Sequence, residues 1–427
     1  MTTVLLYILG IVVFVVILVV SVGWHELGHL IPAKAFGIKV SQYMIGFGKT
    51  IWSRPWRGTE YGVKWIPLGG YIRMAAMYTP HRSKKAPITG WRAQLASEAR
   101  AASLRELEGL TPDQAFYTLS APRKCVIMLG GPTMNLILAL ALTAIAGSGI
   151  GYYDTTTTLE AVSPCLTTEG ATADDCGEGT LPGPAAGAGL RAGDVITAWN
   201  GQATGSWTDV TAAIGEAGEE PSTVTVDRNG QALTFTLTPV KVQDPDLGER
   251  SMVGITSHVG LVRQPLADAP KVLWQQVAAS AKLYAGLPIG VWNTAVDLVK
   301  GNERSLDSPA SIVGVARVSG EITTAIDSGL ADAWRLRLGT WLQLAASLNI
   351  ALWLFNLLPL LPLDGGHVAN ALFEGVRRTA AKARGKPDPG PADSARLMPL
   401  TYAVAGLLIL MTVVLVLADI FNPVDLG

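Results

Sequence analysis

The residues best suited to chemistry lie in the stretch Trp24-His25-Glu26-Leu27-Gly28-His29, which has an H-E-x-x-H pattern. On a helix, positions i and i+4 share a face, so His25 and His29 can offer two imidazole nitrogens to one metal ion. Glu26 is close enough to act as a general base on a metal-bound water. The alternative is two histidines that only hydrogen-bond to their neighbours. Because the chain has only 5 His in 427 residues, the pattern favours a metal site.

The motif lies at the end of an apolar run. Val4 to Val20 carries no charge and the first Lys is Lys34, so residues 1–33 are long enough to span a bilayer. A signal peptide is the alternative, but no basic segment precedes the run and no small-residue cleavage site follows it. At 1.5 Å per residue, His25 lies roughly 32 Å along a helix from Val4. The motif is therefore expected near the far end of the first span.

The composition of the chain also indicates a membrane protein. It is 49% hydrophobic with a mean hydropathy of +0.33 and only 16% charged residues, which is too apolar for an ordinary soluble enzyme. The length leaves room for two or three domains. Three cysteines exclude a disulfide-framed scaffold and a cysteine-rich metal site. The net charge of −1 says little, so the distribution of charge is more informative.

Basic residues dominate the segment 34–124, so the positive-inside rule places it in the cytoplasm and the N-terminus outside. Within it, Tyr61 to Met74 is typical of short strands with a Gly-Gly turn. Ala93 to Leu110 predicts a surface helix whose charges form a solvated face. Residues 125–150 form the second span. Asn135, in its inner half, either makes a helix–helix hydrogen bond or contacts substrate, and packing is favoured.

Residues 151–265 are rich in Asp and Glu and predict a soluble domain outside the membrane. Two strand-like runs, Thr223 to Val226 and Leu233 to Leu237, flank an Asn229-Gly230 turn. Cys165 and Cys176 lie in the first loop of this domain. An oxidising exterior would allow them to pair, although two free thiols remain an alternative.

The last part of the chain contains two further spans. Residues 266–338 mix amphipathic helix with Gly, Ser and Pro breaks. Gly339 to Leu363 is free of charge, and we expect the third span, residues 339–366, to end at Asp364. The basic loop 367–396 is then cytoplasmic. The fourth span, residues 397–418, returns the C-terminus to the outside.

Topology brings the two polar span ends to the same side. Spans one and three both run inward, so Asp364 is expected at the depth of His25 and His29. Two His, one carboxylate and a water form an ordinary catalytic zinc site. The alternative is that Asp364 is a helix-end charge that reaches water. His367 could hydrogen-bond to a metal ligand or have no metal role.

A helical substrate must unwind before water can attack its peptide bond. An enzyme strand that pairs with the extended substrate would hold it open. The segment Gly70 to Met74 could do this, and its residues are Gly70, Tyr71, Ile72, Arg73 and Met74. The alternative is an edge strand at the membrane surface.

With these motifs identified, the sequence resembles the site-2 protease family, intramembrane zinc metalloproteases of the bacterial regulator-of-sigma type with one PDZ domain. HELGH at 25–29 matches the zinc helix of that family, and Asn356-Leu-Leu-Pro359-Leu-Leu-Pro362-Leu-Asp364-Gly365 matches its third-span signature. Supporting similarities are Gly131-Pro132-x-x-Asn135, Gly46-Phe47-Gly48, Gly69 to Met74, Ser308 to Gly314 and the PDZ-like stretch Gly187 to Gly201.

The resemblance implies an α-helical polytopic membrane protein, with about four transmembrane helices and an inserted α+β PDZ-like extracytoplasmic domain, in the bacterial inner membrane. Glu26 would be the catalytic base, with Zn²⁺ held by His25, His29 and Asp364, and Asn356 would help to position substrate. The substrates would be single-span proteins of the anti-sigma factor class, already cut by an upstream site-1 protease. The PDZ domain would screen substrates by size or recognise their ends.

Two alternatives belong to other functional classes. An inactive membrane PDZ adaptor would only bind client proteins, but it has no need of Glu26 and Asp364. A metal transporter would place polar groups through the middle of the membrane, whereas the first and third spans are apolar until their inner ends. The lipid bilayer is an expected partner, and nucleic acid is not.

Overall fold

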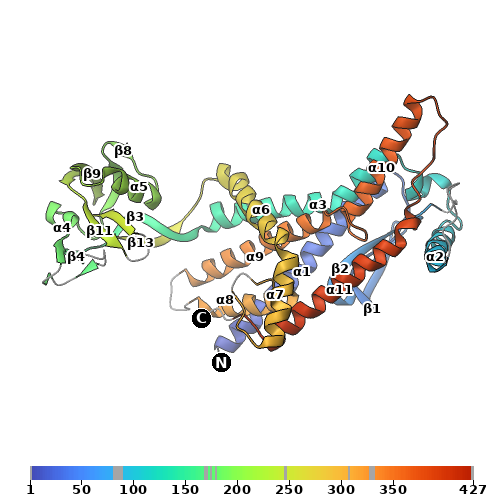
Figure 1. Ribbon diagram of the computed structural model, residues 1–427, viewed down its shortest axis with the longest axis horizontal. Helices are drawn as coiled ribbons and strands as arrows, with labels where there is room; N and C mark the ends of the chain where they lie inside the picture. Colours follow the sequence, from blue (N-terminus) through green and yellow to red (C-terminus); the bar gives the residue numbers. More distant parts are fainter. Residues whose placement is uncertain are drawn as a thin grey trace. The chain divides into compact units, whose positions relative to one another are not determined.

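The computed structural model describes residues 2–79, 90–167, 172–173, 176–177, 180–244, 248–305, 308–326 and 332–424. The chain forms two compact units. Met1–Ile150 and Pro265–Gly427 together make one, here called the helical unit, and Gly151–Gln264 makes the other, the inserted domain. Figure 1 labels the elements of each unit and colours them by their position in the sequence.

In the described part of the chain, four helices are long and apolar enough to cross a membrane. They include α1 (Thr2–Ala35), α3 (Ala121–Ala144, continued by a π-helical stretch Ile145–Ile150), α9 (Ala333–Asn356) and α11 (Met398–Phe421). This number agrees with the four spans expected from hydropathy. An apolar helix satisfies all its backbone hydrogen bonds internally, as a bilayer requires.

The third span differs from the prediction. Helix α9 ends at Asn356, and Asp364 begins a separate helix, α10 (Asp364–Ala383), instead of closing the span at 366. The intervening residues include Pro359 and Pro362, and the Leu361–Pro362 peptide bond is cis. Proline lacks the N–H that a helix needs and disfavours helical conformation in the residue before it. The charge-free run is therefore a helix followed by a turn.

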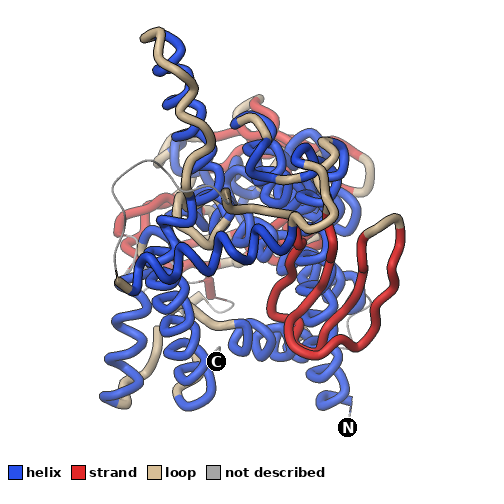
Figure 2. The backbone as a smooth tube through the Cα atoms, turned by 90° about the vertical axis from the view of Figure 1, so that its right-hand side faces the viewer, coloured by secondary structure: helices blue, strands red, loops and turns tan. Residues whose placement is uncertain are grey.

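The polar segment after α1 folds into two long strands, β1 (Val40–Trp56) and β2 (Thr59–Met74), instead of the short strands expected. The chain turns at Arg57-Gly58, and the predicted turn glycines Gly69 and Gly70 lie inside β2. Gly46 and Gly48 have positive φ angles of 91° and 83°, which bend β1. Figure 2 shows both strands as long, bent ribbons at the right of the view.

The bend lets one part of β1 pair on both sides. Gln42 to Ile45 pairs with Gly70 to Arg73 on one side and with Glu60 to Val63 on the other. Gly70 to Arg73 therefore lies at an edge of this sheet among the described residues. Helix α2 (Trp91–Glu106) follows where a surface helix was predicted. Its charges are not all solvated, because Arg100 is buried and donates to Asp393 at 2.8 Å.

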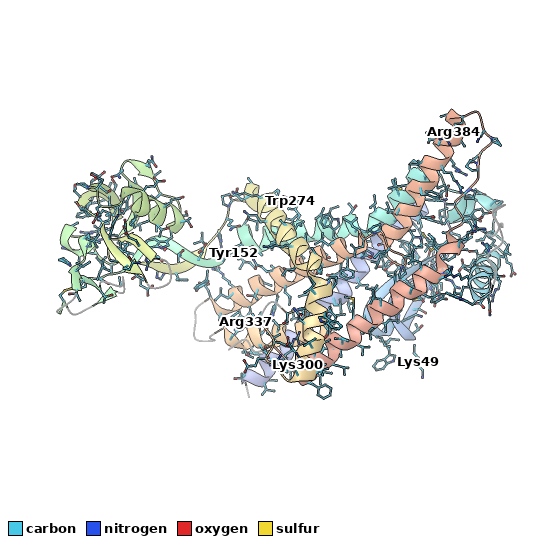
Figure 3. The ribbon with its side chains drawn as sticks, in the orientation of Figure 1. Lys49, Tyr152, Trp274, Lys300, Arg337 and Arg384 are labelled. Carbon is cyan, nitrogen blue, oxygen red and sulfur yellow. A yellow bond between two sulfur atoms is a disulfide. The ribbon has the colours of Figure 1, made fainter. Side chains whose placement is uncertain are left out.

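Helices pack closely around α1. Gly28 of α1 and Gly130 of α3 meet where a Cβ on either would overlap the backbone of the other helix. Such contacts between small residues let apolar helices approach in a membrane. The amphipathic stretch forms α6 (Ala269–Ala285), α7 (Leu287–Lys300) and α8 (Ile312–Ala325). Figure 3 labels Trp274 on α6, Lys300 at the end of α7, and Arg337, which donates to Thr323 and Ile326 carbonyls of α8 and its C-cap.

The inserted domain is an α+β fold around one main sheet with strand order β10-β9-β7-β3-β13, and β8 pairs with β7. These strands are β3 (Tyr152–Val162), β7 (Val195–Trp199), β8 (Gln202–Ala203), β9 (Ser222–Arg228), β10 (Gln231–Leu237) and β13 (Ile255–Val262). Helices α4 (Pro184–Ala188) and α5 (Trp207–Ala217) complete a core that includes Leu159, Ile196 and Trp199. The hairpin at Asn229-Gly230 agrees with the prediction.

Two smaller sheets complete the inserted domain. They contain β4 (Cys165–Thr167), β5 (Thr172–Ala173), β6 (Thr180–Pro182), β11 (Val240–Asp244) and β12 (Gly248–Met252). Of the alternatives left open for Cys165 and Cys176, the structure has the pair joined as a disulfide, with their Cα atoms 5.6 Å apart.

Candidate metal centre

Helices α1 and α10 bring together three side chains that could ligate a metal ion. His25 and His29 lie one turn apart on α1, and Asp364 is the first residue of α10. The Nε2 atoms of the two histidines are 3.1 Å apart, and each lies 3.2 Å from Oδ2 of Asp364. Three donor atoms thus converge on one point.

The arrangement fits a zinc ion. Two ligand atoms at about 2.0–2.1 Å from a tetrahedral zinc lie about 3.3 Å apart, close to the separations found here. Asp364 Oδ2 is buried, and the only groups near it in the described structure are the two imidazole nitrogens at 3.2 Å. A buried acceptor without a donor is costly unless a cation satisfies it.

Helix α3 holds both imidazoles. The Nδ1 atom of His29 lies 2.8 Å from the Ile127 carbonyl oxygen, which can only accept, so Nδ1 carries the proton and Nε2 keeps its lone pair. His25 Nδ1 lies 3.1 Å from Nδ2 of Asn135, which is fully buried. If the amide is turned so that its oxygen faces His25, Asn135 accepts the Nδ1 proton and leaves His25 Nε2 free as well.

Asn135 was predicted to make either a helix–helix hydrogen bond or a substrate contact, with the first favoured. The structure agrees with the favoured alternative, because Asn135 of α3 contacts His25 of α1. That its partner would be a candidate metal ligand was not predicted. The available signal was the spacing: Asn135 lies one helical turn after Gly131, which packs against the same histidines. A Cβ at Gly131 would press on the imidazoles of His25 and His29.

Glu26 lies where the edge strand passes α1. Its side chain is buried, at 8% exposure, and its Cγ lies so close to Gly70 that a Cβ there would be 2.9 Å away. The backbone amide of Ile72 faces the Glu26 carboxylate. The other predicted substrate residues continue from this point: Tyr71, Arg73 and Met74 border a cavity, and Arg73 Nε donates to Glu106 at 3.1 Å.

Two other predicted residues make no hydrogen bond to the three converging donors among the described residues. Asn356 is the last residue of α9, and its Nδ2 donates to the Leu352 carbonyl oxygen at 2.9 Å. His367 lies one turn after Asp364 on α10, close enough to Asp364 and His29 to interact with their charges.

A buried ion pair that the sequence analysis did not predict fixes α10. Lys124 of α3 donates to Glu374 of α10 at 2.8 Å, and both side chains are almost fully buried. Glu374 also accepts the Ala392 backbone N–H at 3.0 Å. Because the partners are 250 residues apart, no local pattern in the sequence marks them. The pair ties α10, which begins with Asp364, to α3, which contacts His25 and His29 through Asn135 and Ile127.

Comparison with known proteins agrees with this geometry. The model of peptidase family M50 matches residues 13–387. The chain is 32% identical to the zinc metalloprotease Rip1 of Mycobacterium tuberculosis over 99% of this chain and 100% of the relative. It is 27% identical to the metalloprotease MmpA of Caulobacter vibrioides, over 87% of each chain. It is 25% identical to the regulator of sigma-W protease RasP of Bacillus subtilis, over 86% of this chain and 90% of the relative.

These matches confirm the expected enzyme class and the zinc cofactor, and they exclude the inactive adaptor as the best description. The four apolar helices make the protein a multi-pass membrane protein. With the family model matching from the first span to α10 and relatives similar along the whole chain, this protein belongs to peptidase family M50, the site-2 family of zinc metalloproteases.

Proposed function

We propose that this metalloprotease hydrolyses peptide bonds in or beside the transmembrane helices of single-span proteins. The observation that carries the proposal is the convergence of His25, His29 and Asp364, with Glu26 beside them, because both histidines and Glu26 lie on the apolar helix α1. A water-requiring site on membrane helices suits a substrate that also lies in the membrane. The process is regulated intramembrane proteolysis, in which a cut in the membrane transmits a signal.

His25, His29 and Asp364 would hold the zinc ion. Bound there, zinc supplies a Lewis acid that polarises the scissile carbonyl and lowers the pKa of water. Glu26 accepts a proton from the attacking water on its carboxylate and then delivers it to the leaving amine nitrogen. The Ile127 carbonyl keeps His29 in the required tautomer, and the amide oxygen of Asn135, turned toward Nδ1, would do the same for His25.

The edge strand Gly70 to Met74 would hold the unwound substrate. Its free edge offers backbone N–H and C=O groups, so an extended peptide can add to the sheet as another strand. Its closeness to Glu26 supports this role, because a peptide paired at Ile72 would lie beside the general base. Asn356 is proposed to help to position the substrate where α9 ends.

We further propose that the enzyme lies in the bacterial inner membrane with both termini and the inserted domain outside. Basic residues in 34–124 and 367–396 support this orientation. The inserted domain is proposed to be PDZ-like. A cavity of about 730 Å³ between α5 and β12, lined by Ile214, Met252 and Gly254 among others, suits a peptide end. The domain would screen substrates by size or by their ends.

The proposed substrates are anti-sigma factors that an upstream site-1 protease has already cut. The support is the relative named as a regulator of sigma-W protease, together with the requirement that the substrate have a membrane span. The bilayer is then a partner of both enzyme and substrate.

The test is cleavage of a panel of single-span proteins by the purified full-length enzyme, beside the Glu26→Gln variant, with bound zinc counted in both. We expect the wild type to cut within or beside a span and Glu26→Gln to bind zinc without cutting. A variant that still cuts would remove Glu26 from its proposed role. If neither protein binds zinc, the proposed ligand set is wrong.

A further inference from the structure

A cavity of about 500 Å³ adjoins the end of the edge strand. It lies between the last residues of β2, helix α2 and the start of α11, all within the helical unit. The buried ion pair of Arg100 with Asp393 joins α2 to the residues that precede α11, so the walls are fixed to each other. The metal-binding and general-base side chains do not line this cavity.

The lining combines apolar walls with an exposed carboxylate that has no cationic partner among the described residues. Met74, Met77, Leu95 and Met398 supply the walls, and Glu98 and Glu106 supply acidic groups. Glu106 is already used, because it accepts from Arg73 and from the Ala76 backbone N–H. Glu98 has a neutral donor, the Gln94 amide at 3.1 Å, and has no cationic partner in the described parts of the chain.

This combination fits a lysine or arginine side chain. Such side chains bury an aliphatic stem against apolar surface and keep the cationic head at a polar rim. Methionine walls adapt to stems of different shape. A purely aliphatic side chain would leave Glu98 without a counterion, and an acidic one would bring it a like charge.

The position of the cavity relates it to a substrate on the edge strand. Ile72 faces Glu26, and the strand borders the cavity from Tyr71 to Met74. At about 3.3 Å per residue, the cavity extends from the level of the proposed base to roughly 7 Å beyond it along an added strand. Single-span proteins carry Lys and Arg immediately on the cytoplasmic side of their span. A substrate on the edge strand would therefore bring basic residues to this cavity.

We infer that the cavity is a subsite for a Lys or Arg side chain in the cytoplasmic flank of the substrate, within about three residues of the cleaved bond. Glu98 pairs with the cationic head. This inference rests on the proposed function, and it adds a specificity-determining residue outside the metal centre. It makes the enzyme read the charge of the substrate next to the point where the span ends.

The experiment scans a single Lys through the uncharged cytoplasmic flank of a cleavable single-span substrate and measures kcat/KM with the full-length enzyme. We expect one position to raise kcat/KM about fivefold to tenfold over the all-neutral flank. Glu98→Gln should bring that ratio to about one. Glu98→Lys should prefer a substrate with Glu at the same position. The matched control is Glu108→Gln, an exposed acid just beyond α2 that should keep the wild-type ratio.

The outcomes separate this inference from the proposed function. If the wild type cuts the neutral substrate in a Glu26-dependent way but shows no preferred Lys position, the subsite inference is wrong and the function stands. A preference that survives in Glu98→Gln also overturns it. If no substrate of the scan is cut while zinc is bound, the proposed function itself fails.

Discussion

At the scale of single residues, the metal centre depends on groups that hold its histidines. Asn135 is fully buried and contacts His25 Nδ1 at 3.1 Å. Mutation of a residue that hydrogen-bonds to a metal-binding histidine typically weakens metal affinity by 10- to 100-fold. We expect Asn135→Ala to weaken zinc binding by about that factor, measured by competition with a coloured chelator. Thr133→Ala, an exposed change on the same helix, should bind zinc like the wild type. Equal affinities for both variants would show that Asn135 serves packing alone.

The residues of the centre differ in how far the sequence predicts them. His25, Glu26 and His29 follow from a compact motif whose spacing has a physical meaning on a helix. Asp364 was predicted from topology, because the first and third spans were expected to run inward and to end at one depth. A helix–helix hydrogen bond was predicted for Asn135, but neither its partner His25 nor the pairing of Glu374 with Lys124 could be predicted, since each depends on contacts between helices that are distant in sequence. Such contacts leave no periodic pattern in either segment.

At the scale of elements, the position of α10 depends on the ion pair between Lys124 and Glu374. Removing one partner of a buried pair leaves an uncompensated charge and costs about 3–5 kcal/mol, whereas replacing both by apolar residues is often neutral. We expect Glu374→Leu to unfold at a lower temperature and to lose zinc, because Asp364 begins the same helix. The double variant Lys124→Met with Glu374→Leu should recover most of both, by calorimetry and metal analysis. If the losses of stability caused by the two single substitutions simply add in the double variant, the two residues do not act as a pair.

Element types were predicted better than element ends. Hydropathy gave four spans, and the amphipathic stretch and the Asn229-Gly230 hairpin agree with the structure. The predicted end of the third span was wrong because an apolar run does not distinguish a helix from a proline-rich turn. The turn predicted at Gly70 was wrong because glycine was interpreted as a turn signal. In the structure Gly70 lies inside β2 and allows this strand to lie against Glu26.

At the scale of the whole molecule, the inserted domain has its own core and its own dependence on pH. Burial raises the pKa of Asp194, but the hydrogen bonds from Arg228 and from the Arg191 N–H outweigh it and hold this pKa below its usual range. Because the pKa of Asp194 is lower in the folded than in the unfolded domain, its ionised carboxylate stabilises the fold at pH values above about 3.9, the unfolded pKa. This contribution is lost as the pH falls through the folded pKa.

In the fragment Gly151–Gln264, we therefore expect Asp194→Asn to lower the free energy of unfolding at pH 7 by about 1–3 kcal/mol, the usual value of hydrogen bonds to a charged group. The difference from the wild type should shrink as the pH is lowered below 3.9. Urea unfolding at several pH values measures it, with the exposed Glu216→Gln as control. A difference that stays constant down to pH 2 would mean that the charge of Asp194 is not what stabilises the domain.

The chain enters and leaves the inserted domain at neighbouring points. Tyr152 of β3 pairs with Val262 of β13, so their Cα atoms are about 5 Å apart and a short Gly-Ser linker from Gly151 to Arg263 can replace the domain without strain. The helical unit keeps its metal-binding residues in such a variant, so zinc binding and Glu26-dependent cleavage should persist. If the domain screens substrates by size, its removal should admit substrates with an untrimmed outer domain.

We expect the ratio of kcat/KM for trimmed over untrimmed substrate to fall at least tenfold in the deletion variant, measured side by side with the full-length enzyme. Zinc content serves as the control for folding of the helical unit. Suppose instead that the variant binds zinc but no longer cuts trimmed substrate. The domain would then deliver substrates by their new ends, because a filter that only excludes cannot be needed for the cleavage of what it already admits.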